Sequence, residues 1–345
     1  MAQRSAATLS KGPRFQISKG LLTVLVSTVV LFVLCAVIAP SSVSSGPLGS
    51  MIPFACILAI AGLGQMLVIQ QAGIDLSVPS AISLAAVIVT KLPQGDNEKL
   101  LGAVLTSLAV AVLVGLLNGF LIGFLKLNPI IATLGTNAML FGFIMAITGG
   151  IPSSSSDLLL SIVGGTTIGV PNTAFIAGII LAVVVLALRK TVAGRRFESI
   201  GSSPAMASTA GLRVRIHHGM AYVWAQLLYA TAGIMIAGII TVSNAFMGDP
   251  YLLPSVAVVV LGGTSLLGGR GLPTATVIAA VFLSQLDQFV LALGVNFAIR
   301  TLVQAAALAI GVAIYTVDWS RVRAVLRKLL SAEGRGQNQA SLPSA

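Results

Sequence analysis

Residues 20–74 read GLLTVLVSTVVLFVLCAVIAPSSVSSGPLGSMIPFACILAIAGLGQMLVIQQAGI and contain no charged side chain. Two apolar runs, at 21–39 and 51–70, flank the polar segment PSSVSSGP at 40–47. A helix of about 20 apolar residues spans a bilayer, so each run predicts one membrane-spanning helix. The proline, serine and glycine residues between the runs predict a loop.

The whole chain has the composition of a membrane protein. Its 345 residues are 56% hydrophobic and 8% charged, whereas soluble domains carry about 25% charged residues. So few charges cannot cover the surface of a soluble domain, and the high hydrophobicity excludes a disordered chain. At about 20 apolar residues per span, the apolar content has room for roughly nine to ten helices.

Charge-free windows along the rest of the chain predict the other spans. The eighth predicted span is the weakest, because its short apolar run also fits a re-entrant or broken helix. We therefore predict an all-α polytopic membrane protein with about ten transmembrane helices. After the first two, the predicted spans cover residues 78–90, 100–125, 130–148, 173–188, 219–242, 253–267, 272–293 and 296–317.

The positive charges predict the orientation of these spans. Lys and Arg are enriched on the cytoplasmic side of membrane proteins. With ten spans and the N-terminus inside, 17 of the 20 Lys and Arg residues fall on the inside, leaving Lys91, Lys99 and Arg300 outside. The net charge of +11 therefore reflects cytoplasmic segments, and no basic face of a soluble domain indicates nucleic acid.

This orientation predicts three regions. Residues 1–20 form a cytoplasmic N-terminal tail, residues 21–318 form the transmembrane domain, and residues 319–345 form a cytoplasmic C-terminal tail. The largest internal cytoplasmic loop covers residues 189–219. Both termini are expected in the cytoplasm, because the number of spans is even.

Two segments of the chain resemble each other. Residues 61–80 contain Ala-Gly, then Gly-Ile-Asp, then Pro-Ser, and residues 232–255 contain Ala-Gly, then Gly-Asp, then Pro-Ser. Five predicted spans separate the two copies, so one would be inverted relative to the other. Inverted repeats with broken helices at matching positions are typical of transporters and indicate the substrate pathway. These residue types are also common in ordinary loops.

Motifs for enzymatic chemistry are missing from the sequence. It contains no GxxxxGK[ST], no HExxH and no GxSxG, so it predicts neither an ATPase site nor a metalloprotease or hydrolase. An ion-driven transporter needs ionisable groups within the membrane. Asp75 and Asp249 fall at span ends, where water is expected to reach them, whereas Asp287 and Arg300 fit a buried pair that is either a proton relay or structural.

Uncharged polar residues are better represented in and near the spans. Amides and hydroxyls replace water around a neutral polyol without the free-energy cost of a buried charge. They are equally common as contacts between transmembrane helices. The residues expected to line or gate a translocation path are Gln65, Gln70, Asp75, Ser77, Asn118, Thr133, Thr136, Asn137, Asn244, Thr264 and Ser265.

The loop at 189–218 has the features of a docking element. It holds six basic residues and one acid, Glu198. Ser-Ser-Pro at 202–204 predicts a helix start and Gly211 predicts its end. A short helix with small side chains suits the groove of another protein, although a plain basic connector also fits. The residues assigned to docking are Arg195, Arg196, Gly201, Pro204, Ala205, Ala207 and Gly211.

Four motifs carry a resemblance to a known family. They are GIDLSV at 73–78, NPIIATLG at 128–135, GRRF at 194–197 with the small residues after it, and AVVVLGGTSLLGGRG at 257–271. In this order they resemble the permease subunits of bacterial ABC importers for monosaccharides, the ribose/xylose/arabinose type.

The resemblance implies a multi-pass protein of the bacterial plasma membrane that is not an enzyme and binds no cofactor itself. It also implies a cytoplasmic ABC ATPase subunit that uses ATP, a periplasmic or surface solute-binding protein, and a second permease chain, identical or paralogous. Two departures limit the comparison. The docking loop reads SPAMA at 203–207 without the acid that the family often has, and Pro79 stands where the family often has glycine.

Three alternatives remain at this stage. The same fold serves permeases for branched-chain amino acids or small signalling molecules, and the residues do not name the solute. An ion-coupled secondary transporter would depend on titration of Asp75 or Asp287. A membrane scaffold would tolerate replacement of the polar residues in the spans.

Overall fold

The computed structural model describes residues 19–296, 298–299, 301–303, 305–306 and 309. The tenth predicted span, Arg300 and the predicted tails lie wholly or largely outside these residues. Within them, seven helices are long and apolar enough to cross a membrane, and two further apolar helices are shorter. This content confirms the predicted all-α membrane fold.

The long helices correspond in order to the first, second, fourth, fifth, sixth, seventh and ninth predicted spans. The short helices correspond to the third and eighth predicted spans. These two spans also have the shortest apolar runs in the sequence. The long helices are α1 (Lys19–Ile38), α2 (Ser45–Gln70), α4 (Leu100–Gly119, continued by the π-helix Phe120–Phe124), α5 (Pro129–Thr148), α7 (Asn172–Lys190), α10 (Val214–Ala237) and α12 (Pro273–Ala292), and the short ones are α3 (Val78–Lys91) and α11 (Leu252–Leu261).

Smaller elements connect the long helices at the two ends of the bundle. The segment after α5 contains a short helix and three very short strands, of which β2 and β3 pair with each other. The remaining strand, β1, pairs antiparallel with β4, which follows α10. These elements are α8 (Val192–Ser202), α9 (Pro204–Thr209), α6 (Asp157–Gly164), β1 (Ser153–Ser154), β2 (Thr166–Thr167), β3 (Val170–Pro171), β4 (Val242–Ser243) and the 3-10 turns Pro40–Val43, Asn97–Lys99 and Asp249–Tyr251.

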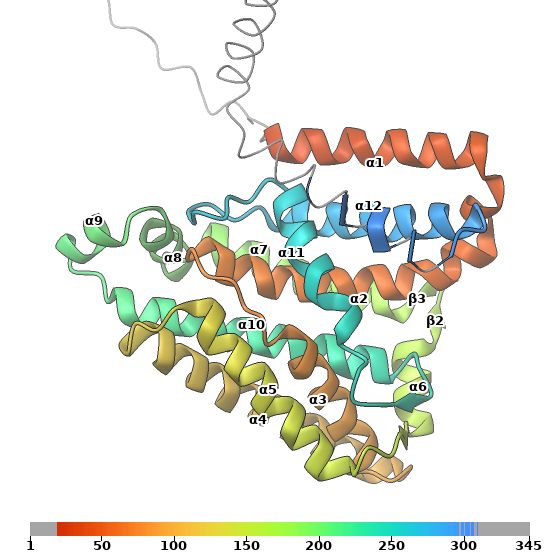
Figure 1. Cartoon of the computed structure of the whole chain (residues 1–345), viewed down its shortest axis with the longest axis horizontal. Coiled ribbons are helices and arrows are strands. Elements are labelled where there is room, and N and C mark those ends of the chain that lie inside the picture. Colours follow the sequence, from red (N-terminus) through yellow and green to blue (C-terminus); the bar gives the residue numbers. More distant parts are fainter. Residues whose placement is uncertain (1–18, 297, 300, 304, 307–308, 310–345) are drawn as a thin grey trace, which may run out of the picture.

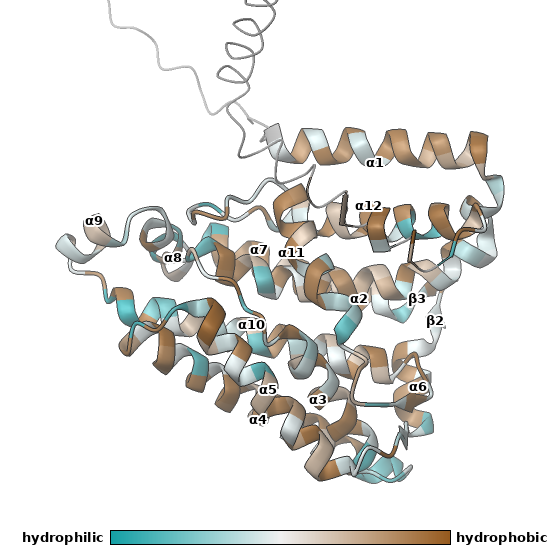
Figure 2. Ribbon diagram, viewed as in Figure 1, coloured by the Kyte–Doolittle hydropathy of each residue, from teal (hydrophilic) through white to brown (hydrophobic). Residues whose placement is uncertain are grey.

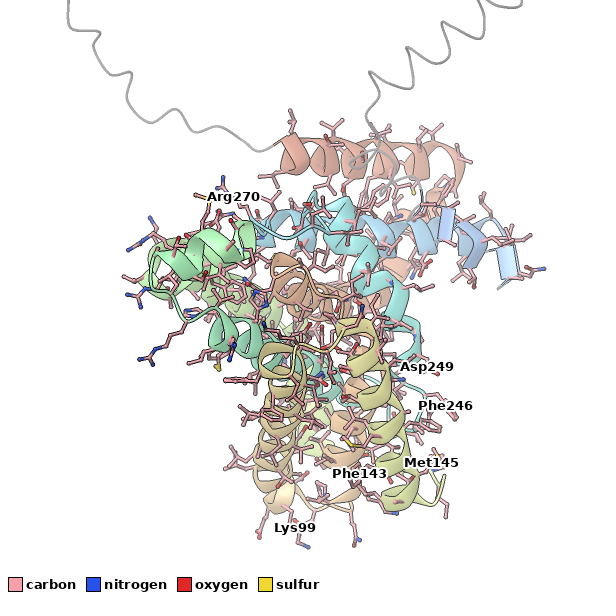
Figure 3. The ribbon with its side chains drawn as sticks, turned by 60° about the vertical axis from the view of Figure 1, so that its left-hand side comes forward. Lys99, Phe143, Met145, Phe246, Asp249 and Arg270 are labelled. Atoms are coloured by element: carbon pink, nitrogen blue, oxygen red, sulfur yellow. The ribbon has the colours of Figure 1, made fainter. Side chains whose placement is uncertain are left out.

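The arrangement of the connections agrees with the predicted orientation. Figure 1 shows α8 and α9 at one end of the bundle and α6 with the β2–β3 hairpin at the other. Figure 3 shows Lys99, a residue predicted outside, far from Arg270, a residue predicted inside. Along the helices between these ends, Figure 2 shows predominantly hydrophobic residues, as expected of helices that cross a membrane.

One helix begins before the span predicted for it. The seventh span was predicted from residue 219, whereas α10 begins at Val214. Arg215, His217 and His218 are therefore on the first turns of a helix. A helix can extend beyond the apolar part of a membrane, so hydropathy alone places its start too late.

The two similar segments pack in an exchanged way. Helix α2 packs against α11 and α12, and α10 packs against α3 and α4. A Cβ atom on Gly62 of α2 would lie 2.5 Å from Val258 of α11, and one on Gly233 of α10 would overlap the carbonyl oxygen of Ile82 in α3. Helix α2 thus contacts α11, which follows α10 in the chain, and α10 contacts α3, which follows α2. A glycine permits each of these two contacts. This pattern supports the internal repeat.

A glycine ridge on α4 brings it against α10. Cβ atoms on Gly115, Gly119 and Gly123 would lie 2.5 Å, 2.7 Å and 2.6 Å from backbone atoms of α10. Small residues at this spacing let helix backbones approach closely in a membrane. These glycines are therefore packing residues of the α4–α10 contact.

We predict that Gly119→Ala lowers the free energy of unfolding by about 1–3 kcal/mol, because the added methyl group meets a backbone carbonyl that cannot move aside. Gly102 is the matched control, since it lies on the same helix with nothing within 4 Å of an added Cβ. Gly102→Ala should be neutral or slightly stabilising. Thermal unfolding of both variants in detergent tests this, and equal stability would contradict the packing assignment.

Candidate functional site

A helix break lies between α2 and α3. Helix α2 ends at Gln70 and α3 begins at Val78, and residues 71–77, here called the α2–α3 break, lie outside both helices. The backbone N–H groups of residues 71–73 still donate to carbonyls of the last turn of α2. Backbone N–H and C=O groups within a membrane-spanning bundle must find partners inside the protein. The partners of this break are therefore the natural starting point for a site.

Side chains of α5 accept hydrogen bonds from backbone N–H groups at the break and at the start of α3. The hydroxyl of Thr133 accepts a hydrogen bond from the backbone N–H of Leu76 at 2.9 Å. The amide oxygen of Asn137 accepts one from the backbone N–H of Ser80 at 3.1 Å, in the first turn of α3. Both side chains come from the helix start that Asn128 caps. The motif at 128–135 therefore places α5 against the break.

Gln65 and Tyr229 satisfy another part of the break. With its oxygen toward the backbone N–H of Asp75, the Gln65 amide accepts from that group and donates to the Asp75 carbonyl, both at 3.2 Å. Its nitrogen then lies 2.8 Å from the hydroxyl oxygen of Tyr229 on α10. All three residues are fully buried. The break is thus bonded to helices of both halves of the chain.

The carboxylate of Asp75 is the centre of this cluster. One carboxylate oxygen accepts hydrogen bonds from the backbone N–H and the hydroxyl of Ser77. The other accepts from the amide of Gln226 on α10 at 3.2 Å, and the same amide lies 2.7 Å from the Ser77 hydroxyl. Asn118 of α4 lies 3.4 Å from that hydroxyl and accepts from Thr136 at 2.6 Å. No ion pair among the described residues includes Asp75.

The expectation that water reaches Asp75 is wrong. Its side chain is 0% exposed, because α4, α5 and α10 close around the break. Asp249, its counterpart in the second similar segment, is exposed as predicted. The two halves of the repeat therefore use the same residue type differently.

The structure brings together some of the predicted path residues and not others. Asn244 is exposed and caps Phe246, and Ser265 is exposed. Thr264 is buried and accepts from the backbone of Leu272 at 3.3 Å, away from the break. The residues gathered at the break are Gln65, Asp75, Ser77, Asn118, Thr133, Thr136 and Asn137.

Three residues of this cluster are absent from the predicted path residues. Gln226 and Tyr229 make the hydrogen bonds described above, and Tyr222 is so close that a Cβ on Gly73 would lie 2.5 Å from its hydroxyl oxygen. A glutamine and two tyrosines spaced along an otherwise apolar span were the available signal. They lie three or four residues apart, on one face of α10.

A second cluster joins α8 to the end of α2. The Gln71 amide donates to the carbonyl of Phe197 in α8 at 2.9 Å. Gly201 of α8 lies against the carbonyl oxygen of Gln70, where a Cβ atom would overlap. That carbonyl also accepts from the backbone N–H of Gly269 at 3.0 Å. Gln70, predicted as a path residue, therefore lies in this cluster. We call Gln70, Gln71, Arg189, Phe197, Glu198, Gly201 and residues 268–271 the α8 junction.

The predicted docking helix is present as α9. The Ser203 hydroxyl caps its start, with Pro204 in the first turn, and Gly211 has the φ of +78° that ends it. Ala205 is exposed and Met206 is 74% exposed, but Ala207 is 5% exposed and faces inward. Ala207 is therefore a packing residue of α9, whereas Ala205 lies on its free face.

Helix α8 was not predicted. Its buried residues Phe197, Ile200 and Gly201 face the bundle, and Arg195 and Arg196 are exposed. Helix α8 is short and amphipathic, with basic and small residues between its apolar ones. It therefore contains no apolar run that hydropathy would detect. The loop therefore presents two helices at its surface, both at the end predicted to be cytoplasmic (Figure 1).

Comparison with known proteins decides the family. Residues 48–318 match the family described as "Branched-chain amino acid transport system / permease component". The chain belongs to this family of permeases. The match covers the break, both clusters and most of the described bundle.

Several named proteins are similar in sequence to this permease over most of its length. It is 32% identical to the probable ABC transporter permease y4mJ of Sinorhizobium fredii over 83% of this chain and 86% of that one. It is 29% identical to the ribose import permease RbsC of Escherichia coli K12, over 84% and 92%. It is also 29% identical to the fructose import permease FruF of Bifidobacterium longum, over 86% and 87%. No solved structure matches.

The permease is thus a multi-pass transport subunit of the inner membrane and not an enzyme. Permeases of ABC importers work in general with an ATPase and a solute-binding protein. At the break and at the α8 junction, polar contacts join segments that are far apart in the sequence.

We predict that Asp75→Asn lowers the free energy of unfolding by about 1–3 kcal/mol, because one acceptor oxygen becomes a donor that faces the Gln226 amide or the Ser77 N–H. Asp249→Asn is the matched control, since Asp249 is exposed at the equivalent point of the repeat. Thermal unfolding in detergent measures both. Equal losses in the two variants would contradict the central role of Asp75.

Proposed function

We propose that this permease forms half of the translocation path of an ATP-driven importer for a neutral, polyhydroxylated solute, a monosaccharide. The observation that carries the proposal is the chemistry of the buried polar groups. Among the buried residues that the structure describes, Asp75 is the only charged one, and the other polar side chains are amides and hydroxyls. An amino acid carries both charges and would need charged partners once it is desolvated.

The relatives support the same class of solute. The ribose and fructose permeases each share 29% of their aligned residues with this chain over most of its length. The family description names branched-chain amino acids, and that class is the alternative. Uptake measurements separate the two.

The α2–α3 break is proposed as the gate of the path. Gln65, Asn118, Thr133 and Asn137 are bonded to the break or its neighbours in the closed arrangement. When the break shifts, these amides and hydroxyls become available to sugar hydroxyls at little cost, because one hydrogen bond replaces another. Binding at such a site is weak, as release of the solute requires. A second permease chain completes the path.

The two ends of the bundle are proposed as docking sites for different partners. The ATPase, which uses the ATP, docks on α8 and α9, which carry the exposed cations Arg195 and Arg196 and the exposed Ala205 and Met206. The solute-binding protein delivers the sugar at the opposite end, where α6 and the β2–β3 hairpin lie (Figure 1). The permease itself holds no cofactor in this scheme.

Gentle purification from the native host, followed by mass spectrometry and reconstitution, tests the proposal. An ATPase with a P-loop in roughly equal amount is expected, together with uptake of labelled ribose or fructose that requires ATP and the binding protein. Uptake of leucine in place of the sugars would favour the alternative solute. A permease that purifies alone and transports without ATP would contradict the whole proposal.

We predict that Ala205→Arg reduces ATP-driven uptake about tenfold, the size of a moderate coupling between sites, because a long cation replaces a methyl group on the docking face. Gln94→Arg adds the same charge at an exposed turn of the opposite end, and it should leave co-purification of the ATPase unchanged. Co-purification of the ATPase and uptake in liposomes are measured for both variants. Full uptake with Ala205→Arg would remove α9 from the docking surface.

A further inference from the structure

We infer that α8 drives the α2–α3 break directly, and that Gly201, Glu198, Arg189 and Arg270 are the positioning residues that make α8 and the end of α2 move as one unit. The inference rests on the proposed function and adds the route by which ATPase motion reaches the gate. It assigns a role to the GGRG motif at 268–271, which the path and the docking helix leave unexplained.

The first step is the contact between backbones. The carbonyl oxygen of Gln70 lies against Gly201 on one side and accepts from the N–H of Gly269 on the other. No side chain separates α8 from α2 at this point. Because backbone atoms at a helix end cannot rotate out of the way as side chains do, a displacement of α8 is transmitted to Gln70 without slack.

The second step is the shape of the GGRG segment. Gly268 has a φ of +88° and Gly269 a φ of +107°, values that side chains rarely allow. A Cβ atom on Gly268 would lie 2.8 Å from the carbonyl oxygen of Gly201, and one on Gly271 would lie 2.7 Å from the Gln70 side-chain oxygen. The segment therefore fits around the α8–α2 contact only because three of its four residues are glycines.

The third step is a three-residue ion network. Glu198 of α8 lies 3.6 Å from the guanidinium of Arg189 at the end of α7 and 3.6 Å from that of Arg270. Arg189 also donates to the carbonyl of Gly271 at 2.9 Å. Each half-exposed pair contributes at most about 1 kcal/mol, so the network orients α8 while the backbone contact transmits the motion. Figure 3 shows Arg270 near the surface at this end.

The last step connects the α8 junction to the gate. Gln70 and Gln71 belong to the α8 junction, and the next six residues are the rest of the break that ends at Ser77. Gln71 is itself bonded to α8 through the Phe197 carbonyl. A shift of α8 therefore pulls on a segment whose other end is bonded to Gln226 of α10 and to Thr133 of α5. Helix α8 and the α2–α3 break each have a defined set of contacts, which a second conformation would replace with another set. Coupling between two sites requires such a two-state element.

The test compares two helical glycines in the complete complex of permease, ATPase and binding protein. Gly201→Ala places a methyl group against the Gln70 carbonyl, whereas Gly178→Ala, on α7, has nothing within 4 Å of the new Cβ. We expect Gly201→Ala to keep ATP hydrolysis within about twofold and to lower uptake per ATP hydrolysed about tenfold. Gly178→Ala should match the unchanged complex. Equal uptake per ATP in Gly201→Ala would overturn the inference.

A second pair of variants keeps the test decisive if Gly201→Ala does not assemble. Arg189→Gln removes a cation bonded to Glu198 and Gly271, whereas Lys190→Gln removes an exposed cation that is in no ion pair among the described residues. We expect only Arg189→Gln to lower uptake per ATP and the stimulation of ATP hydrolysis by the binding protein. A merely structural role would lower thermal stability and leave this ratio unchanged, which would overturn the inference.

The two levels of failure are distinguishable. If the unchanged complex shows no ATP-driven uptake, the proposed function fails. If the unchanged complex transports and all four variants transport with the same ratio of solute to ATP, the proposed function stands and the role of the α8 junction is wrong.

Discussion

The structure depends on one constraint, which is that backbone polar groups within a membrane must be paired inside the protein. The chain is not helical between α2 and α3, so the backbone groups of the break need hydrogen-bond partners from other parts of the protein. Asp75, Gln65, Thr133 and Asn137 supply those partners from their own segment and from two helices. The polar residues of the permease are thus gathered by the break, and any motion of the break must exchange these hydrogen bonds.

The repeat uses this constraint asymmetrically. In the first half, the carboxylate of Asp75 is buried and bonded to α10. In the second half, Asp249 is exposed, and the Ser83 hydroxyl instead accepts from the backbone N–H of Gly248 at 2.9 Å. Two halves that pack in an exchanged way therefore carry different polar chemistry. The first break, which also contacts α8, is the one suited to gating.

Local signals predicted the architecture well, and tertiary contacts account for what they missed. Hydropathy found the seven long and two short apolar helices of the described residues. Ser203, Pro204 and Gly211 predicted α9, because these signals act within a few residues. The burial of Asp75 depends on α4, α5 and α10, which no local pattern reports. Helix α8 has no long apolar run, and Gln226 becomes informative only when α10 is placed beside the break. The solute and the partners' docking faces stay predictions.

Hydrogen–deuterium exchange in the complete complex shows whether the α2–α3 break moves together with α8. The amide hydrogens of Leu76, Ser77 and Gly269 are followed with and without ATP, since each donates to a group that holds the break or the α8 junction. The account predicts that exchange at all three changes when ATP binds, together with exchange in α8. A change confined to α8, with Leu76 and Ser77 unaltered, would contradict it, because the gate would then move independently of the docking end.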